Sequence, residues 1–330
     1  MKVAITGATG LLGANLAAAL VEHGSYSITC TRRESSDIDH LSALPVSWVV
    51  ADLSDVGALA RAFDGADWVF HCAASTSIRA RVRPDHTAAN IDGTRNVLEA
   101  VQTAGVGRLV HTSSVVATAL STDGSLVDEA ARWNFDELGL DDGYSTSKKQ
   151  SEDMVLESAE ADVDAVVVNP SFMFGPYDAK LSSGRMVLAV AKRKLPGFTT
   201  GMGNYVNARD VALGMISAAQ SGRRGERYIL GNENLSYREV FARIASQAGV
   251  KPPRRRIPHG LARVAGIAGD LKQWISGRDA DLNSITVGYG YQMGSVYSSD
   301  KARRELDYRP TSIDDGIAAA LDWFRARGLL

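Results

Sequence analysis

A glycine-rich segment near the first residue constrains the fold of this chain more than any other feature. The apolar run 3–6 leads directly into Gly7, Gly10 and Gly13, and a helix-like segment follows, which we expect to open at about Ala14. Backbone N–H groups that no side chain covers, at the N-terminus of a helix, can contact a phosphate closely. The first two glycines are three residues apart, one more than in the standard dinucleotide fingerprint, but strand, turn and helix follow in the required order. The segment therefore predicts a site for a dinucleotide pyrophosphate.

Short apolar runs alternate with segments of helical periodicity through the first half of the chain. Helical segments are expected at 11–23, 56–63 and 92–104. The runs that predict strands are 3–6, 27–31, 46–51, 68–72, 109–113 and 165–169, with one more at 226–230. Strands that alternate with helices form a parallel sheet covered on both faces, and right-handed crossovers make it doubly wound. We therefore predict an α/β fold with a doubly wound parallel (Rossmann) sheet.

The alternation becomes irregular after Pro170, where glycine, proline and serine break the chain repeatedly. The last hundred residues are mostly helix-like, with segments at 237–248, 261–275 and 313–327. We predict a dinucleotide-binding Rossmann domain from residues 1–168 plus about 204–232. A smaller, mostly helical substrate-binding lid would come from about 169–203 plus 233–330.

Composition excludes several classes of partner. Lys and Arg together number 36 against 38 Asp and Glu, so the basic excess of a nucleic-acid binder is absent and we expect no nucleic-acid partner. No apolar run reaches the roughly 18 residues of a membrane helix, so we expect no membrane partner. The first residues lack the apolar stretch of a signal peptide, which favours a cytoplasmic location. Cys30 and Cys72 lie in strand-like runs and are expected to be buried thiols, and the histidines lack ligand-like spacing, so we expect no metal.

The end of the second predicted strand bears on the choice of cofactor. The run 28–31 is followed by Arg32 and Arg33, and two guanidinium groups suit a ribose 2′-phosphate, whereas an acid there would favour the 2′-hydroxyl of NAD. We expect NADP(H) to be preferred, with NAD(H) as the alternative; the pair could also be a solvated basic patch. Asp52, at the end of the third strand, could contact the adenine edge or simply hold a turn.

A tyrosine and a lysine lie one helical turn apart, at Tyr144 and Lys148. Positions i and i+4 share a helix face, and a nearby cation favours the phenolate, so the pair can perform acid–base chemistry. Ser114 ends the fifth strand, at the edge where parallel sheets place their ligands, and its hydroxyl could bond a substrate carbonyl. The alternative for Ser114 is a cap or turn hydroxyl.

These motifs together resemble the extended short-chain dehydrogenase/reductases, the NAD-dependent epimerase/dehydratase superfamily. Within it the chain is similar to the dihydroflavonol-reductase-like and hopanoid-associated sugar-epimerase-like branch. The resemblance covers nearly the whole chain, through the segments 6–13, 52–53, 71–74, 90–98, 112–114, 144–148, 169–176 and 225–235.

The resemblance implies a role for each matched residue. Tyr144 would be the acid–base catalyst, Lys148 would bind the nicotinamide ribose and lower the pKa of Tyr144, and Ser114 would orient the carbonyl. The cofactor would be bound by Gly7, Thr9, Gly10, Leu11, Leu12, Gly13, Arg32, Arg33, Asp52, Leu53, Ala73, Ala74, Lys148, Asn169, Pro170 and Ser171. Some members of the family dimerise, so a homodimer is one expectation.

Two valines, Val115 and Val116, stand where a dehydratase needs extra acid–base groups, so dehydration is disfavoured. The arginine pair suits an exchanging NADPH better than a retained NAD, which favours an NADPH-dependent carbonyl reductase or alcohol dehydrogenase acting on a small-molecule carbonyl or alcohol. A nucleotide-sugar epimerase is the alternative, and a non-catalytic cofactor-sensing protein is the second.

Residues that could line the substrate pocket lie where the sheet meets the lid. Their mixed apolar and aromatic character favours a ketone or aldehyde with an apolar body, although packing between the two domains explains them equally well. The candidates are Thr76, Phe172, Met173, Tyr177, Arg185 and Met186.

Overall fold

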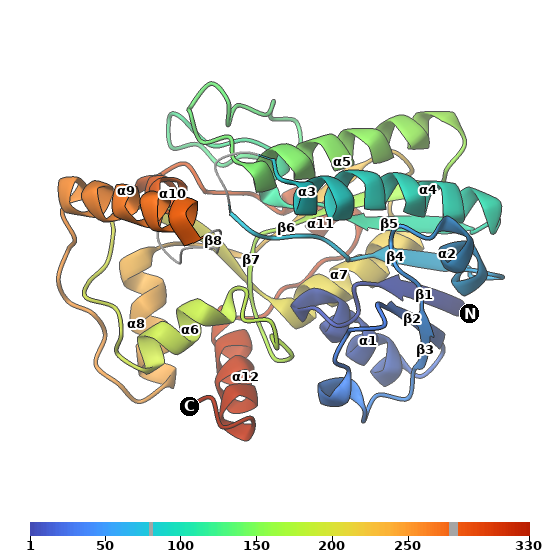
Figure 1. The fold of residues 1–330 in the computed structure, drawn as a ribbon, viewed down its shortest axis with the longest axis horizontal. Helices are drawn as coiled ribbons and strands as arrows, with labels where there is room; N and C mark the ends of the chain where they lie inside the picture. Colours follow the sequence, from blue (N-terminus) through green and yellow to red (C-terminus); the bar gives the residue numbers. More distant parts are fainter. Residues whose placement is uncertain (79–81, 277–282) are drawn as a thin grey trace.

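A seven-stranded parallel sheet forms the larger part of the protein (Figure 1). The computed structural model describes residues 1–78, 82–276 and 283–330. The strand order is β3-β2-β1-β4-β5-β6-β9, and every neighbouring pair is parallel. The strands are β1 (Lys2–Thr6), β2 (Ser27–Arg32), β3 (Ser47–Val50), β4 (Trp68–His71), β5 (Arg108–Thr112), β6 (Ala165–Pro170) and β9 (Arg227–Leu230). This order confirms the predicted doubly wound Rossmann sheet.

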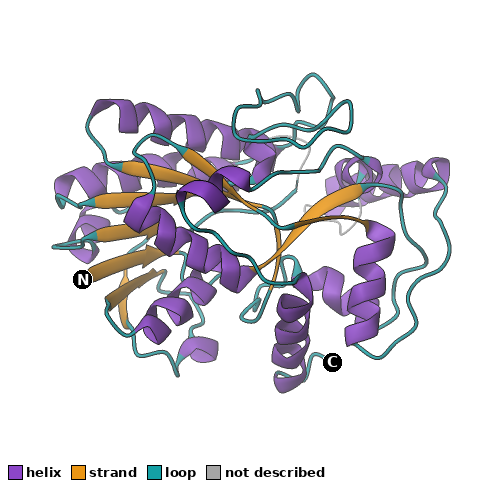
Figure 2. Cartoon of the chain, turned by 180° about the vertical axis from the view of Figure 1, so that it is seen from behind, coloured by secondary structure: helices purple, strands orange, loops and turns teal. Residues whose placement is uncertain are grey.

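Helices cover both faces of this sheet (Figure 2). Because side chains alternate along a strand, Ile5 of β1 joins the core beneath α1 and α7, whereas Ala4 joins the core on the opposite face. The first face carries α1 (Leu11–His23) and α7 (Ala208–Ser221), and the second carries α2 (Val56–Ala62), α4 (Gly93–Thr103) and α5 (Gly143–Ala161). Short turns complete this region, at η1 (Asp39–Leu41), α3 (Pro84–His86), the π-helical η2 (Thr87–Asp92) and η3 (Val115–Ala117).

A smaller region lies at the other end of the molecule from β3 (Figure 1). It contains a three-stranded sheet of order β10-β8-β7, which the sequence analysis missed when it expected a mostly helical lid. Its strands are β7 (Phe172–Phe174), β8 (Met202–Asn207) and β10 (Glu233–Ser236). Its helices are α6 (Gly184–Ala191), α8 (Tyr237–Gln247), α9 (His259–Ser276), α10 (Ser284–Tyr291) and α12 (Ile313–Ala326). Phe174, Tyr205, Val240, Ile317 and Phe324 form a separate core there.

The chain crosses between the two regions more than once. It passes from β6 directly into β7, returns to the large sheet through α7 and β9, and leaves again at β10, while α11 (Asp300–Glu305) packs near β9. The carboxyl ends of β5 and β6 therefore face the segments that lead into the smaller region. The predicted domain limits, 1–168 plus about 204–232 against the remainder, stay a prediction.

The described residues provide neither a helix that could span a membrane nor a cluster of metal ligands. None of their helices combines the length and apolar character needed to cross a membrane. Within the same residues, no three His, Cys, Asp or Glu side chains gather as metal ligands.

Candidate active site

The glycine loop runs directly into α1. Gly10 is the N-cap in an extended conformation, and the first helical bond joins the Ala14 N–H to the Gly10 carbonyl at 2.9 Å. The helix therefore begins at Leu11, three residues before the expected opening at Ala14, because the cap is a glycine of the loop itself. The free N–H groups of the first turn consequently belong to the segment predicted to bind pyrophosphate.

Two glycines of the loop occupy positions that a side chain would fill. Gly7 has a φ of +73°, and a Cβ atom there would lie 2.5 Å from the backbone nitrogen of Ala73. A Cβ atom on Gly13 would meet the carbonyl oxygen of Gly7. The loop is thus folded tightly against both α1 and the segment that contains Ala73 and Ala74, and it offers bare backbone as a dinucleotide pyrophosphate requires.

The two arginines at the end of β2 differ in their contacts and exposure. Arg32 Nη1 donates to the carbonyls of Arg33 and Glu34, each at 3.2 Å, while the Arg33 side chain is exposed. Asp52 accepts the Ser54 N–H at 2.9 Å and the Ser54 hydroxyl at 2.8 Å; these bonds, with a smaller contribution from Arg33, lower its pKa. The turn role of Asp52 is therefore present, and its contact with adenine stays a prediction.

A lysine that the sequence analysis did not select lies beside the glycine loop. Lys180 Nζ donates to the hydroxyl of Thr9 at 3.2 Å, across 171 residues of chain. Partial desolvation and the charge of Arg33 lower the pKa of Lys180. A lysine among glycine, serine and proline resembles a solvated loop cation, so the sequence contains no signal that would have identified it.

The catalytic candidates Tyr144 and Lys148 lie on the first turns of α5. Asp142 caps this helix, because its carboxylate accepts the N–H groups of Tyr144 at 2.7 Å and Ser145 at 2.8 Å. The Ser145 hydroxyl accepts the Asp142 N–H in return, which completes a capping box. The start of the helix, and with it the position of both catalytic candidates, is therefore fixed by its own sequence.

Lys148 is buried, with 4% of its surface exposed, and its Nζ donates to the Thr112 carbonyl at 2.7 Å. Burial lowers the pKa of Lys148 to about 8, although Cys72 and Glu152 act in the opposite direction. Thr112 is the last residue of β5, so the ammonium group lies at the carboxyl edge of the sheet.

The Ser114 hydroxyl lies close enough to the Tyr144 phenol to favour its ionised form, which lowers the pKa of Tyr144. Burial outweighs this effect and Asp142 adds a repulsive charge, so the pKa of Tyr144 is raised overall. The expected lowering of this pKa by Lys148 stays a prediction. The Ser114 hydroxyl also accepts the Val116 N–H at 3.4 Å, so it caps η3 as well.

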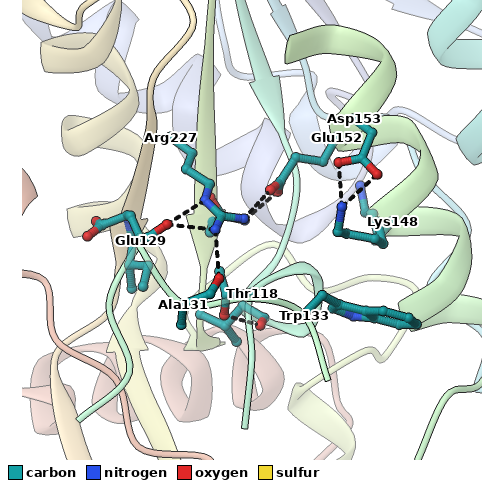
Figure 3. A network of polar contacts seen from close by, with 12 residues as sticks. Thr118, Glu129, Ala131, Trp133, Lys148, Glu152, Asp153 and Arg227 are labelled. Atoms are coloured by element: carbon teal, nitrogen blue, oxygen red, sulfur yellow. Dashed lines mark hydrogen bonds and ion pairs between the residues drawn. The ribbon is translucent and has the colours of Figure 1, made fainter. Parts of the chain in front are cut away.

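A buried network of hydrogen bonds lies next to α5 and contacts the backbone of Ser114 (Figure 3). Glu152 is fully buried and its carboxylate accepts Asn169 Nδ2 at 2.6 Å and Arg227 Nη1 at 2.9 Å. Arg227 also donates to the carbonyls of Glu129 and Ala131. Asn169 Nδ2 donates in addition to the Ser114 carbonyl at 3.0 Å, so the network reaches Ser114. Glu152 lies one turn after Lys148, a spacing that could have marked it in the sequence.

Other cofactor candidates lie at the ends of neighbouring strands. Within the described chain, Ser171 Oγ and Asn169 Oδ1 are buried and without a hydrogen-bond partner, so both oxygens can serve a polar ligand. Leu53 contacts the start of α4 beside Gly93, and its carbonyl accepts Asn96 Nδ2 at 2.8 Å. Pro170 ends β6 next to Ser171.

The substrate candidates occupy several environments. Thr76 is exposed, and Phe172 is 38% exposed on β7, where its ring contacts Phe174 and Tyr205. Met173 packs against the core of the large sheet, and Met186 packs against the core of the smaller region. Tyr177 has a φ of +69°, and Arg185 Nε donates to the Leu181 carbonyl. Their contact with a substrate stays a prediction.

Comparison with known proteins places this geometry in a family. The model of the NAD dependent epimerase/dehydratase family matches residues 3–231. A protein of Synechocystis sp. with the provisional name dihydroflavonol 4-reductase is 35% identical, over 98% of this chain and 94% of its own length. Sterol demethylase protein B of Methylococcus capsulatus is 32% identical over the full length of both. The crystal structure of gox2253 is 32% identical, with a TM-score of 0.85 over 100% of this chain and 99% of that one. The chain therefore belongs to the NAD-dependent epimerase/dehydratase family and is an extended short-chain dehydrogenase/reductase.

Proposed function

We propose that this chain is an NADP(H)-dependent carbonyl reductase, or alcohol dehydrogenase in reverse, that acts on a ketone or aldehyde. The observation that carries the proposal is the grouping of Tyr144, Ser114 and Lys148 at the carboxyl edge of β5. The Ser114 hydroxyl lies close enough to the Tyr144 phenol to influence its pKa, and the buried Lys148 ammonium, from the same helix as Tyr144, is bonded to the last carbonyl of β5.

The residues of the site suit protonation of a carbonyl oxygen. Bound NADPH supplies the hydride for reduction. Ser114 donates a hydrogen bond to the carbonyl oxygen, which polarises it and stabilises the developing negative charge. Tyr144 keeps its proton at neutral pH because its pKa is raised, so its hydroxyl can deliver that proton to the oxygen. Lys148, hydrogen-bonded to Thr112, offers its remaining donors to the nicotinamide ribose.

Three cations near the glycine loop support NADP(H) over NAD(H). Arg32 ends β2 and Arg33 follows it, where the ribose 2′-substituent is expected, and Lys180 bonds Thr9 within the loop. Guanidinium and ammonium groups bind a phosphate dianion strongly, and the structure holds Arg33 exposed for such a contact.

An apolar carbonyl compound is the substrate class that the site favours. The exposed ring of Phe172 and the two valines after Ser114 provide apolar surface, and a relative is named for sterol demethylation. The same valines disfavour dehydration, because neither can transfer a proton. A nucleotide-sugar epimerase, as in part of the family, is the alternative.

The test is a panel of aldehydes, diketones, flavonoid-like ketones, sterol ketones and sugar nucleotides, scored by consumption of NADPH and, in parallel, of NADH. We expect consumption of NADPH with at least one apolar ketone. Interconversion of a sugar nucleotide without net NADPH consumption would favour the epimerase. Tight NADPH binding with no turnover across the panel would favour a cofactor-sensing protein.

A further inference from the structure

Helix α9 (His259–Ser276) packs with its small residues inward and its large apolar residues outward. Ala262 and Gly266 form its buried side, and a Cβ atom on Gly266 would lie 3.0 Å from Val287 of α10. Six large apolar side chains on the helix are between 56 and 80% exposed: Leu261, Val264, Ile267, Leu271, Trp274 and Ile275. A globular helix normally shows the reverse arrangement.

These six residues form one continuous stripe, which we call the α9 stripe. At 100° per residue they fall within an arc of about 140° on the side opposite Ala262 and Gly266. Arg263 and Lys272 flank the stripe, one on each edge. The single acid of the helix, Asp270, lies on the α10 side, where it accepts hydrogen bonds from Ser284. Cations along both edges of an apolar stripe are the pattern of a helix that lies on a membrane surface.

The segment before α9 adds further positive charge. Arg254, Arg255 and Arg256 are all exposed, and the Phe198 backbone holds this segment in place through bonds to Arg255 and Ile257. No acidic residue stands between 251 and 269. The cluster therefore complements an anionic surface.

We propose that the α9 stripe docks on an anionic membrane, with its apolar side chains at the headgroup boundary and the neighbouring cations on lipid phosphates. The composition led us to expect no membrane partner, since no spanning segment is present, but a surface helix needs none. A second copy of the chain fits the stripe less well. Two copies packed stripe against stripe would bring the cations of both copies to one interface, and residues 251–269 contain no acid to pair with them.

The α9 stripe is connected to the candidate active site through α10. Asn283 caps α10 and its Nδ2 donates to the Ile78 carbonyl at 3.1 Å. Tyr289 of α10 donates to the Asp142 carboxylate at 2.8 Å, and Asp142 caps the helix of Tyr144. A membrane that holds α9 would therefore lie beside the lid of the catalytic site, where an apolar substrate can be taken from the bilayer. The docking does not depend on which carbonyl the site reduces.

The test is flotation of the full-length protein with vesicles of phosphatidylcholine, with and without 30% phosphatidylglycerol. We expect binding to the anionic vesicles that weakens in high salt, and much weaker binding to neutral ones. The double variant Leu271→Ser with Trp274→Ser should reduce the partition coefficient by about tenfold or more. Leu126→Ser, at a residue that is 57% exposed outside α9, is the matched control and should bind as the wild type does.

A second variant tests the charges without altering the helix. Arg254→Glu with Arg255→Glu should abolish the preference for anionic vesicles, while NADPH-dependent turnover of a water-soluble carbonyl stays unchanged. The proposal is overturned if the wild-type protein floats with neither vesicle, or if the Leu271/Trp274 variant binds undiminished. A different result would also overturn it: light scattering shows a wild-type dimer that the Leu271/Trp274 variant disrupts, and the wild type does not bind vesicles. A second copy of the chain would then cover the stripe.

Discussion

The charges beneath α5 and the charges beside the glycine loop are held in contrasting ways. Glu152 and Lys148 are almost completely buried, and each has fixed partners at hydrogen-bond distance. Arg33 and Lys180 are exposed, and the hydrogen bond from the Lys180 side chain to Thr9 is 3.2 Å long.

The contrast indicates that the buried charges maintain the structure of the candidate site, whereas the exposed cations are available to bind a cofactor. A buried charge without its partner is strongly destabilising, so groups beneath α5 determine the structure of the catalytic edge. Exposed cations contribute little to folding, and their side chains stay available for a ligand. Substitutions in the first set should therefore alter turnover or stability, and those in the second set should alter cofactor affinity alone.

The largest effect is expected from Tyr144→Phe, which removes the acid of the proposed reaction. Activity should fall on the order of 10²–10⁴-fold, the usual contribution of general acid–base catalysis, with NADPH affinity nearly unchanged. Initial rates and a fluorescence titration of NADPH measure the two quantities. Tyr289→Phe, which removes a hydroxyl bonded to Asp142, is the matched control and should retain most activity. Near-normal turnover by the Tyr144 variant would remove this tyrosine from the mechanism.

Glu152→Ala should be the most destabilising change in the buried set. It leaves the Arg227 guanidinium and the Asn169 amide without their carboxylate, and loss of one partner of a buried ion pair typically costs about 3–5 kcal/mol. Urea unfolding measures the change. The neighbouring Asp153→Ala breaks only a half-exposed pair with Lys149 and should cost about 0.5 kcal/mol. Equal losses in the two variants would contradict the contrast between the regions.

The buried ammonium of Lys148 should make the free energy of unfolding depend on pH. The pKa of Lys148 is about 8 in the folded protein against an ordinary value of 10.5, so the unfolded chain binds the proton more tightly. Below pH 8 the lowered pKa of Lys148 reduces the free energy of unfolding by about 3 kcal/mol, because each unit of pKa difference corresponds to about 1.36 kcal/mol. This reduction fades as the pH rises from about 8 to 10.5. Wild type should therefore gain stability over that window relative to Lys148→Met, as measured by urea unfolding; parallel curves would mean that the lysine is not desolvated.

A smaller effect is expected from Arg32→Ala with Arg33→Ala. Loss of charge-assisted bonds to a 2′-phosphate should raise the KM for NADPH roughly tenfold to a hundredfold, with little change for NADH and in the free energy of unfolding. Steady-state kinetics with both cofactors measures this. Arg95→Ala, which breaks an exposed pair with Asp92, is the matched control. Equal effects on the two cofactors would mean that the pair does not contact the 2′-phosphate.

The sequence predicted the large sheet well and the small one not at all. The strands of the large sheet are continuous apolar runs because both faces are covered, so composition alone identifies them. In contrast, β10 has the sequence ENLS and is half-buried, and β8 contains glycine and asparagine. Such strands form because a partner distant in the sequence pairs with them, which local patterns do not record.

The same limit applies to the site. Tyr144, Lys148 and Ser114 could be found because local spacing and strand ends determine their positions. The spacing of Glu152 one turn after Lys148 could have marked that residue. Arg227 could not be found, because 75 residues separate it from Glu152 and single charged residues are usually at the surface. Lys180 was missed for the same reason, since only the fold brings it to Thr9.

The close approach of Gly7 to Ala73 restricts how this protein can evolve. Any side chain at position 7 would push the first loop away from the segment that follows β4, so selection can hardly vary that loop without displacing this segment. The end of β2 has no such restriction, because its arginines are near the solvent. Natural or engineered changes of nucleotide preference should therefore accumulate at positions 32 and 33, while the glycines persist.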